Sequence, residues 1–279
     1  MSGGRTTEAI PEPGTPAGRA GLAALLRDPG SALIGLDYDG TLAPIVSDPS
    51  AAIVHQDATA VLRRLSARVG TLAVITGRPA AVAADLGGLS DVPRIVVLGH
   101  YGIERWESGT VVAPPPPPGL AKARAELPGV LASAGAPPGT WVEDKGHALA
   151  VHTRRAADPD GALRRLRDPL AKLAERVGLA VEPGRLVIEL RPPGMDKGAA
   201  LKNLVAERRA RAVLFCGDDL GDLAAFAAVG ELRSAGVPGV AVCSGSAEVT
   251  ALAEKADLVV DGPGGVVGLL GAIARALGG

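Results

Sequence analysis

Aromatic residues make up only 2% of this 279-residue chain, so stacking platforms for single-stranded nucleic acid are scarce. Neither sign of charge dominates, because the sequence contains 29 Lys and Arg residues and 30 Asp and Glu residues. No broad basic field is therefore present to attract nucleic acid or anionic lipid. We expect neither a nucleic-acid partner nor a membrane partner, and a core built mainly from Ala, Val and Leu.

Cysteine is also rare, and Cys216 and Cys243 form no metal-ligand or redox spacing. A reducing cytoplasm is the simplest compartment for such a chain. No apolar run reaches the length of about 18 residues that a transmembrane helix needs. Residues 1–20 are rich in Gly, Pro and Thr and lack an apolar stretch, which predicts a disordered tail and no secretory signal.

Apolar strands alternate with amphipathic helices from Gly21 onward. Residues 33–37, 72–76 and 95–99 are short apolar runs that predict buried strands, and residues 57–69 carry apolar positions at helical spacing. This alternation favours an α/β fold with a Rossmann-like parallel sheet and helices on both faces. The same pattern returns after Pro193, with a helix expected over 197–208. Further strands are expected over 212–216, 240–242 and 258–260, and a last helix over 266–277.

An α+β module interrupts that pattern. Five prolines, Pro114 to Pro118, form a stiff extended segment that indicates a domain boundary, with a recognition motif as the alternative. Helix, hairpin, helix and hairpin are expected in turn over residues 119–134, 140–154, 158–177 and 179–190. We therefore predict a core domain over 21–109 and 193–279 and an inserted cap domain over 110–192.

Two carboxylates, Asp37 and Asp39, follow the first apolar strand in the sequence Asp37-Tyr38-Asp39-Gly40-Thr41. Ligands bind at the carboxyl ends of strands in α/β sheets. Two carboxylates this close stay ionised only if a cation or a shared proton offsets their repulsion. The pair predicts a metal-assisted phosphoryl-transfer site, in which one carboxylate attacks and the other moves protons. The alternative is a surface turn, since Asp and Gly are common turn residues.

A second acidic cluster, Gly217-Asp218-Asp219-Leu220-Gly221-Asp222, follows a later apolar strand. Mg²⁺ prefers hard oxygen ligands. We expect Asp218 to complete a metal site with Asp37 and the backbone carbonyl of Asp39. Asp219 and Asp222 would lie behind these ligands and orient waters or other groups. Helix capping is the competing interpretation, most plainly for Asp222.

Thr76 and Lys197 add a hydroxyl and a cation. Thr76 ends a strand, and its hydroxyl and the Gly77 N–H are suited to phosphoryl oxygens, although an ordinary turn explains them as well. Lys197 opens a helix and would neutralise the aspartate nucleophile and the phosphate together. Arg78 and His100 are candidates for the same cleft, and a capping role is the alternative for His100.

The order Asp-x-Asp, Thr, Lys and Asp-Asp resembles the haloacid dehalogenase superfamily of aspartate-dependent phosphatases. The first motif is residues 37–41, the second is Val74-Ile75-Thr76-Gly77-Arg78, the third is Lys197 and the fourth is residues 217–219. The resemblance covers nearly all of residues 31–275. An α+β cap between the second and third motifs is typical of one branch.

Within that branch, the chain most resembles the trehalose-6-phosphate phosphatases. The segments that carry this likeness are residues 99–104, 142–146, 151–154, 182–185 and 188–192. The resemblance implies that Glu143, Lys145 and Glu189 contact the sugar from the cap. Alternation along a strand puts Glu143 and Lys145 on one face. An exposed cross-strand salt bridge is the alternative.

The fourth motif departs from the family pattern, with Gly221 and Leu223 where Thr and Glu are usual. The expected reaction is Mg²⁺-dependent hydrolysis of trehalose 6-phosphate, with Asp37 as nucleophile and Asp39 as acid and base. The cap would close over the sugar, with hinges near 109–118 and 191–194. The departure leaves open a relative acting on sucrose phosphate or on a pseudo-disaccharide such as validoxylamine 7'-phosphate. A phosphomutase and a non-catalytic sugar-phosphate-binding regulator also stay open at this point.

Overall fold

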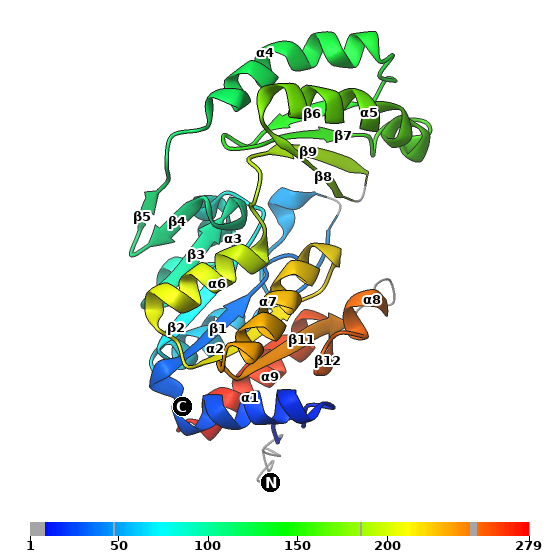
Figure 1. The fold of residues 1–279 in the computed structure, drawn as a ribbon. Coiled ribbons are helices and arrows are strands. Elements are labelled where there is room, and N and C mark those ends of the chain that lie inside the picture. Colours follow the sequence, from blue (N-terminus) through cyan, green and yellow to red (C-terminus); the bar gives the residue numbers. More distant parts are fainter. Residues whose placement is uncertain (1–8, 47, 185, 246–249, 279) are drawn as a thin grey trace. The chain divides into compact units, whose positions relative to one another are not determined.

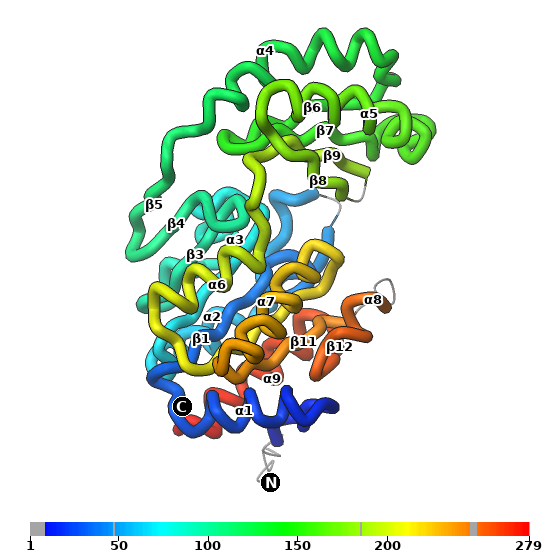
Figure 2. The backbone as a smooth tube through the Cα atoms, in the orientation of Figure 1, coloured from blue at the N-terminus to red at the C-terminus, as the bar shows by residue number. Residues whose placement is uncertain are grey.

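The computed structural model describes residues 9–46, 48–184, 186–245 and 250–278. The chain divides into two compact units. Residues 1–112 and 196–279 form one, which we call the core unit, and residues 113–195 form the other, which we call the cap unit. Figures 1 and 2 follow the backbone from the core unit through the cap unit and back into helix α6. The two units are described separately.

The core unit contains an eight-stranded sheet in the order β12-β11-β10-β1-β2-β3-β4-β5. The six strands from β12 to β3 are parallel, whereas β4 and β5 pair antiparallel with their neighbours. The bounds of these strands are β1 Ala32–Leu36, β2 Thr71–Ile75, β3 Ile95–Gly99, β4 Glu104–Glu107, β5 Thr110–Val112, β10 Ala212–Gly217, β11 Gly239–Gly245 and β12 Leu258–Asp261. Every residue of β1, β2, β3 and β10 is buried, as expected for parallel strands covered on both faces.

Helices cover both faces of this sheet (Figure 1). On one face, Ile34 and Leu36 share an apolar cluster with residues of α2 and α9. On the other, Leu33 and Phe215 pack with residues of α6 and α7. The helices of the core unit are α1 Pro16–Arg27, α2 Ala58–Ser66, α3 Ala80–Leu86, α6 Lys197–Arg208, α7 Leu223–Ser234, α8 Thr250–Ala253 and α9 Gly262–Ala276, with short 3₁₀ turns between several of them. The predicted α/β class with helices on both faces is confirmed.

The cap unit is a four-stranded antiparallel sheet, in the order β6-β7-β9-β8, packed against two helices. The elements are α4 Pro118–Ser133, β6 Trp141–Asp144, β7 Leu149–His152, α5 Pro159–Val177, β8 Ala180–Gly184 and β9 Val187–Arg191. Alternate strand residues such as Leu149, Val151 and Ile188 join Leu166 and Leu170 of α5 in a separate core. The other face of the sheet carries the alternate residues, among them Glu143, Ala150 and Glu189.

One expectation needs correction. Part of the tail predicted to be disordered over 1–20 is helical, because α1 begins at Pro16. Thr15 caps the helix by accepting a hydrogen bond from Gly18 N–H at 2.9 Å, and proline suits the first helical position. Gly14 N–H also donates to Asp257 O. Residues 1–8 lie outside the described part of the chain, as does Arg185. No helix among the described residues combines the length and apolar composition needed to span a bilayer.

Candidate active site

The polar residues singled out in the core unit gather at one edge of its sheet. Asp37 follows β1, Thr76 follows β2 and Asp218 follows β10, and β1 lies between β10 and β2 in parallel register. Parallel strands end at the same edge, so these three side chains begin within a few strand spacings of one another. Lys197, the first residue of α6, joins them.

Three buried carboxylates form the acidic part of the site. One oxygen each of Asp37, Asp218 and Asp222 lies within 4.8 Å of the other two. Asp37 is 4% exposed, Asp218 3% and Asp222 0%. Like charges at this separation and burial repel strongly unless a cation or a proton lies among them. The structure thus brings the first and fourth sequence motifs together.

Gly40 and Gly217 make this close approach possible. A Cβ atom on Gly40 would lie 1.9 Å from Asp218 Oδ2, and Gly40 adopts a φ of +76°, where glycine is favoured. A Cβ atom on Gly217 would lie 2.4 Å from Cγ of Asp222. Gly40 thus lets its loop approach Asp218, and Gly217 leaves room for Asp222 within its own loop.

Lys197 is the counter-charge of the cluster. Its Nζ lies 2.7 Å from Asp37 Oδ1 and 2.8 Å from Asp222 Oδ1. Asp222 also accepts hydrogen bonds on Oδ2 from Asp218 N–H at 3.0 Å and Asp219 N–H at 3.3 Å. Asp222 thus orients Lys197 and the loop that carries Asp218. Asp219 caps the short turn after it, accepting from Gly221 N–H at 2.8 Å.

The protonation equilibria reflect this crowding. Burial raises the pKa of Asp37 well above its usual range, and Lys197 opposes this while Asp222 and Asp218 add to it. Burial, Asp219 and Asp222 raise the pKa of Asp218 to about 7. Burial opposes the charge of Lys197, but Asp222 and Asp37 outweigh it and hold its pKa well above the usual range.

The donor set fits a hard divalent cation. Asp218 Oδ1 is buried and has no hydrogen-bond partner among the described residues, although a buried carboxylate oxygen normally finds one. The neighbouring donors are carboxylate oxygens, the ligand type that Mg²⁺ prefers, and no thiol or imidazole of the described residues joins that group. One lysine does not balance three carboxylates. A cation between Asp37 and Asp218 would supply both the missing charge and the missing partner.

Arg78 lies against Asp39. Its Nε and Nη2 each donate to one carboxylate oxygen of Asp39 at 2.7 Å, and its Nη1 donates to Pro49 O at 2.8 Å. The guanidinium carbon lies 5.2 Å from the ring centre of buried Tyr38. Arg78 was expected among the substrate-binding residues, and in the structure its guanidinium faces the second aspartate of the first motif.

Thr76 and Gly77 lie in the turn that leads to Arg78. The Thr76 hydroxyl accepts a hydrogen bond from Arg78 N–H at 3.2 Å, and a Cβ atom on Gly77 would lie 2.7 Å from the Tyr101 hydroxyl. His100 N–H donates to Arg78 O at 3.0 Å, and Tyr101 N–H donates to Thr76 O at 2.9 Å. Residues after β3 therefore hold the turn after β2 through its backbone.

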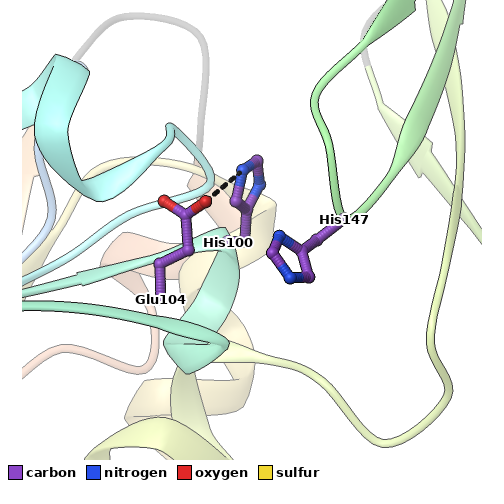
Figure 3. A group of neighbouring side chains, drawn as sticks. All are labelled: His100, Glu104 and His147. Atoms are coloured by element: carbon purple, nitrogen blue, oxygen red, sulfur yellow. Dashed lines mark ion pairs between the residues drawn. The ribbon is translucent and has the colours of Figure 1, made fainter. Parts of the chain in front are cut away.

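His100 is buried and pairs with Glu104 (Figure 3), whose oxygen lies 3.6 Å from His100 Nε2. Both His100 and Tyr101 adopt left-handed backbone conformations, with φ of +47° and +57°, which is uncommon outside glycine. The other oxygen of Glu104 accepts from Ala80 N–H at 2.7 Å, at the start of α3. In the core unit, His100 and Glu104 therefore stabilise the loop behind Thr76 and Arg78.

The three cap residues share the helix-free face of their sheet. Glu143 and Glu189 flank Ala150 in register on adjacent strands. Lys145 Nζ lies 2.6 Å from Glu189 Oε2, whereas the buried Oε1 of Glu189 has no hydrogen-bond partner among the described residues. Glu143 Oε2 lies 2.9 Å from His152 Nε2. Ion pairs between neighbouring strands are therefore present at these residues, and an unused carboxylate oxygen remains beside them.

Sequence reasoning missed one contributor in the core unit and one cluster of rings in the cap unit. Ser244, near the end of β11, is buried and donates to Gly40 O at 2.6 Å, which anchors the loop after Asp39. Its signal was the same as for Thr76, a polar residue ending a buried apolar strand.

In the cap unit, Trp141 stacks on His152 with ring centres 4.4 Å apart, and the guanidinium carbon of Arg155 lies over the Trp141 ring, 4.6 Å from its centre. Only the fold brings these three together.

Comparison with known proteins agrees with this geometry. The family model described as trehalose-phosphatase matches residues 35–260. A trehalose-phosphate phosphatase of Mycobacterium marinum is 37% identical over 212 residues, which cover 70% of this chain and 50% of that protein. A probable trehalose-phosphate phosphatase of Sinorhizobium fredii is 33% identical over 218 residues, which cover 76% of this chain and 78% of that protein.

Among solved structures, the trehalose-6-phosphate phosphatase C-terminal domain of C. albicans superposes with a TM-score of 0.71 at 25% identity, covering 96% of this chain and 99% of that one. The chain spans about half the length of the M. marinum relative. The resemblance seen in the motifs is confirmed, and the chain belongs to the trehalose-phosphatase family.

Proposed function

We propose that this chain is a Mg²⁺-dependent phosphatase that hydrolyses trehalose 6-phosphate to trehalose and phosphate. The observation that carries the proposal is the convergence of Asp37, Thr76, Lys197 and Asp218 at one sheet edge in a member of the trehalose-phosphatase family. A binding protein has no need of a buried carboxylate held between a lysine and a second acidic loop.

In the first step, a carboxylate oxygen of Asp37 bonds to phosphorus and the bond between phosphorus and the sugar oxygen breaks. Asp39 gives a proton to the departing sugar oxygen, so trehalose leaves as a neutral alcohol. Lys197 favours the ionised form of Asp37 that attacks, and it offsets phosphoryl charge during transfer. Thr76 O–H and Gly77 N–H are the proposed donors to the phosphoryl oxygens.

In the second step, Asp39, now ionised, takes a proton from water as that water attacks phosphorus. The bond from phosphorus to Asp37 breaks, and inorganic phosphate is released. Asp37, Asp218 and the Asp39 backbone carbonyl would hold Mg²⁺. The cation supplies compensation for the negative charge of the transferring group. Asp222 and Asp219 orient Lys197 and the Asp218 loop.

Sugar recognition is assigned to Glu143, Lys145 and Glu189. Directional hydrogen bonds from charged groups suit disaccharide hydroxyls, and the unused Oε1 of Glu189 is an acceptor of that kind. Because Glu143 and Glu189 lie either side of small Ala150, the face between them is not filled by a bulky side chain.

The test is phosphate release by the purified full chain with Mg²⁺. We expect trehalose 6-phosphate to be turned over with the highest kcat/KM in a panel that also holds sucrose phosphate, validoxylamine 7'-phosphate and glucose 6-phosphate. A preference for another member of the panel would replace the substrate and keep the chemistry. Binding of these compounds without phosphate release, or transfer of phosphate to another sugar position, would overturn the hydrolase proposal.

A further inference from the structure

The Arg78 guanidinium makes hydrogen bonds from all three of its nitrogens within the core unit. Three of its nitrogens donate, two to the oxygens of Asp39 and one to Pro49 O, and its flat face lies over Tyr38. Tyr38 is itself fixed, because its hydroxyl donates to Ala52 O at 2.9 Å. The Arg78 side chain is 13% exposed and that of Asp39 is 40% exposed. The arginine is thus the fixed partner and the carboxylate the more accessible one.

The backbone of Arg78 is fixed as well. Its N–H donates to the Thr76 hydroxyl, and its carbonyl accepts from His100 N–H. The His100 segment is in turn tied to α3 through Glu104, which accepts from Ala80 N–H. The segments around Tyr38 and Pro49 therefore hold the guanidinium of Arg78, and those around Thr76 and His100 hold its backbone.

We propose that Arg78 is a positioning residue that fixes the carboxylate of Asp39, and that it is not a ligand of the phosphoryl group. This rests on the proposed function, in which Asp39 moves the protons. A carboxylate on a loop samples several rotamers, and proton transfer requires one of them. Two parallel charge-assisted hydrogen bonds from a planar fork fix both the position and the plane of the carboxylate. Lysine has no such fork, so a lysine at this position keeps the charge and loses the orientation.

Positioning of Asp39 and binding of the phosphoryl group predict different kinetics for a variant of Arg78. p-Nitrophenolate leaves without a proton, so formation of the aspartyl-phosphate from p-nitrophenyl phosphate needs phosphate ligands but not Asp39. Hydrolysis of the aspartyl-phosphate needs Asp39 as a base. A positioning role therefore predicts an intact burst of p-nitrophenolate followed by slow turnover, whereas a phosphate ligand is needed in both phases.

The experiment compares the wild type, Arg78→Lys, Asp39→Asn and the double variant by rapid mixing with p-nitrophenyl phosphate and Mg²⁺. For Arg78→Lys we expect a burst rate within threefold of wild type. Its steady-state turnover should be lower by about 10- to 100-fold, a fraction of the usual acid–base contribution. Orthovanadate affinity, measured by calorimetry, should change less than threefold. The double variant should turn over no more slowly than Asp39→Asn alone.

The matched control is Arg211→Lys, at an exposed Arg–Asp pair with Asp28 outside the site, which should match wild type throughout. A burst that collapses in Arg78→Lys, or orthovanadate affinity lowered tenfold or more, would overturn the positioning role and make Arg78 a phosphate ligand. Losses that multiply in the double variant would also overturn it. A wild type with neither burst nor phosphate release would overturn the proposed function itself.

Discussion

Lys197 Nζ lies 2.8 Å from Asp222 Oδ1, and both side chains are buried. The other oxygen of Asp222 accepts the N–H groups of Asp218 and Asp219, so one carboxylate serves the lysine and the acidic loop together. This carboxylate therefore couples the helix that begins at Lys197 to the loop that follows β10.

We expect Asp222→Asn to disturb both partners. Either orientation of the amide points an N–H group at a donor, the Lys197 ammonium or the loop N–H groups. Leaving a buried donor unsatisfied costs about 1–3 kcal/mol. Turnover should fall by about 100-fold, the loss expected when one charge-stabilising group is misplaced. Thermal unfolding measures the loss of stability, and phosphate release measures the loss of turnover.

The control is Asp158→Asn, at an exposed capping aspartate of α5. It should leave stability and turnover unchanged, because asparagine caps a helix equally well. An unaltered Asp222→Asn enzyme would contradict the coupling.

Asp37→Asn should abolish turnover while the fold persists. Removing a nucleophile lowers turnover by about 10⁴-fold or more. Because burial and neighbouring carboxylates raise the pKa of Asp37, its ionised form is disfavoured in the folded state, so a neutral isostere should not lower the melting temperature of the metal-free protein. Phosphate release together with differential scanning calorimetry tests this. Release at the wild-type rate would remove Asp37 from the nucleophile role.

Metal-free protein should lose stability as pH rises from about 4 to about 7. The pKa of Asp218 is raised to about 7 in the folded protein, so the folded state binds more protons than the unfolded state across that window. Mg²⁺ competes with these protons, so its stabilising effect should grow over the same range. Melting temperatures with Mg²⁺ and with a chelator, from pH 5 to pH 8, measure this. In Asp218→Asn, the difference in melting temperature between Mg²⁺ and chelator should depend less on pH. Equal melting temperatures with and without Mg²⁺ at pH 8 would contradict a cation site.

Glu143→Ala should separate sugar recognition from chemistry. If Glu143 contacts sugar hydroxyls, kcat/KM for trehalose 6-phosphate should fall by about 10- to 100-fold, since a buried polar contact contributes about 1–3 kcal/mol. Hydrolysis of p-nitrophenyl phosphate should stay within twofold. Glu175→Ala, at an exposed glutamate of α5, is the matched control and should alter neither. Equal losses on both substrates would refute the recognition role.

Much of the fold was predictable because the parallel strands are continuous apolar runs, such as Ala212–Gly217, and a polar residue directly follows β1, β2, β3 and β10. The helix over Leu223–Ser234 was missed because it is apolar on most sides and shows no helical stripe. The antiparallel strand Glu104–Glu107 was missed because only Trp106 in it is buried, so it reads as a polar loop.

The site was predictable only to the level of strand ends. The positions of Asp37, Thr76 and Asp218 follow from topology, because neighbouring parallel strands end together. Which side chains then pair depends on tertiary geometry, and sequence spacing does not carry it. The fork of Arg78 on Asp39 and the ion pair of Lys145 with Glu189 are of this kind.

Gly40 imposes a constraint on relatives of this chain. A methyl group there would occupy the place of the Asp218 carboxylate. A homologue that keeps every acidic residue but replaces this glycine would therefore have to move the Asp218 carboxylate away from the proposed cation site. Counting conserved aspartates alone would misclassify such a protein as an active enzyme.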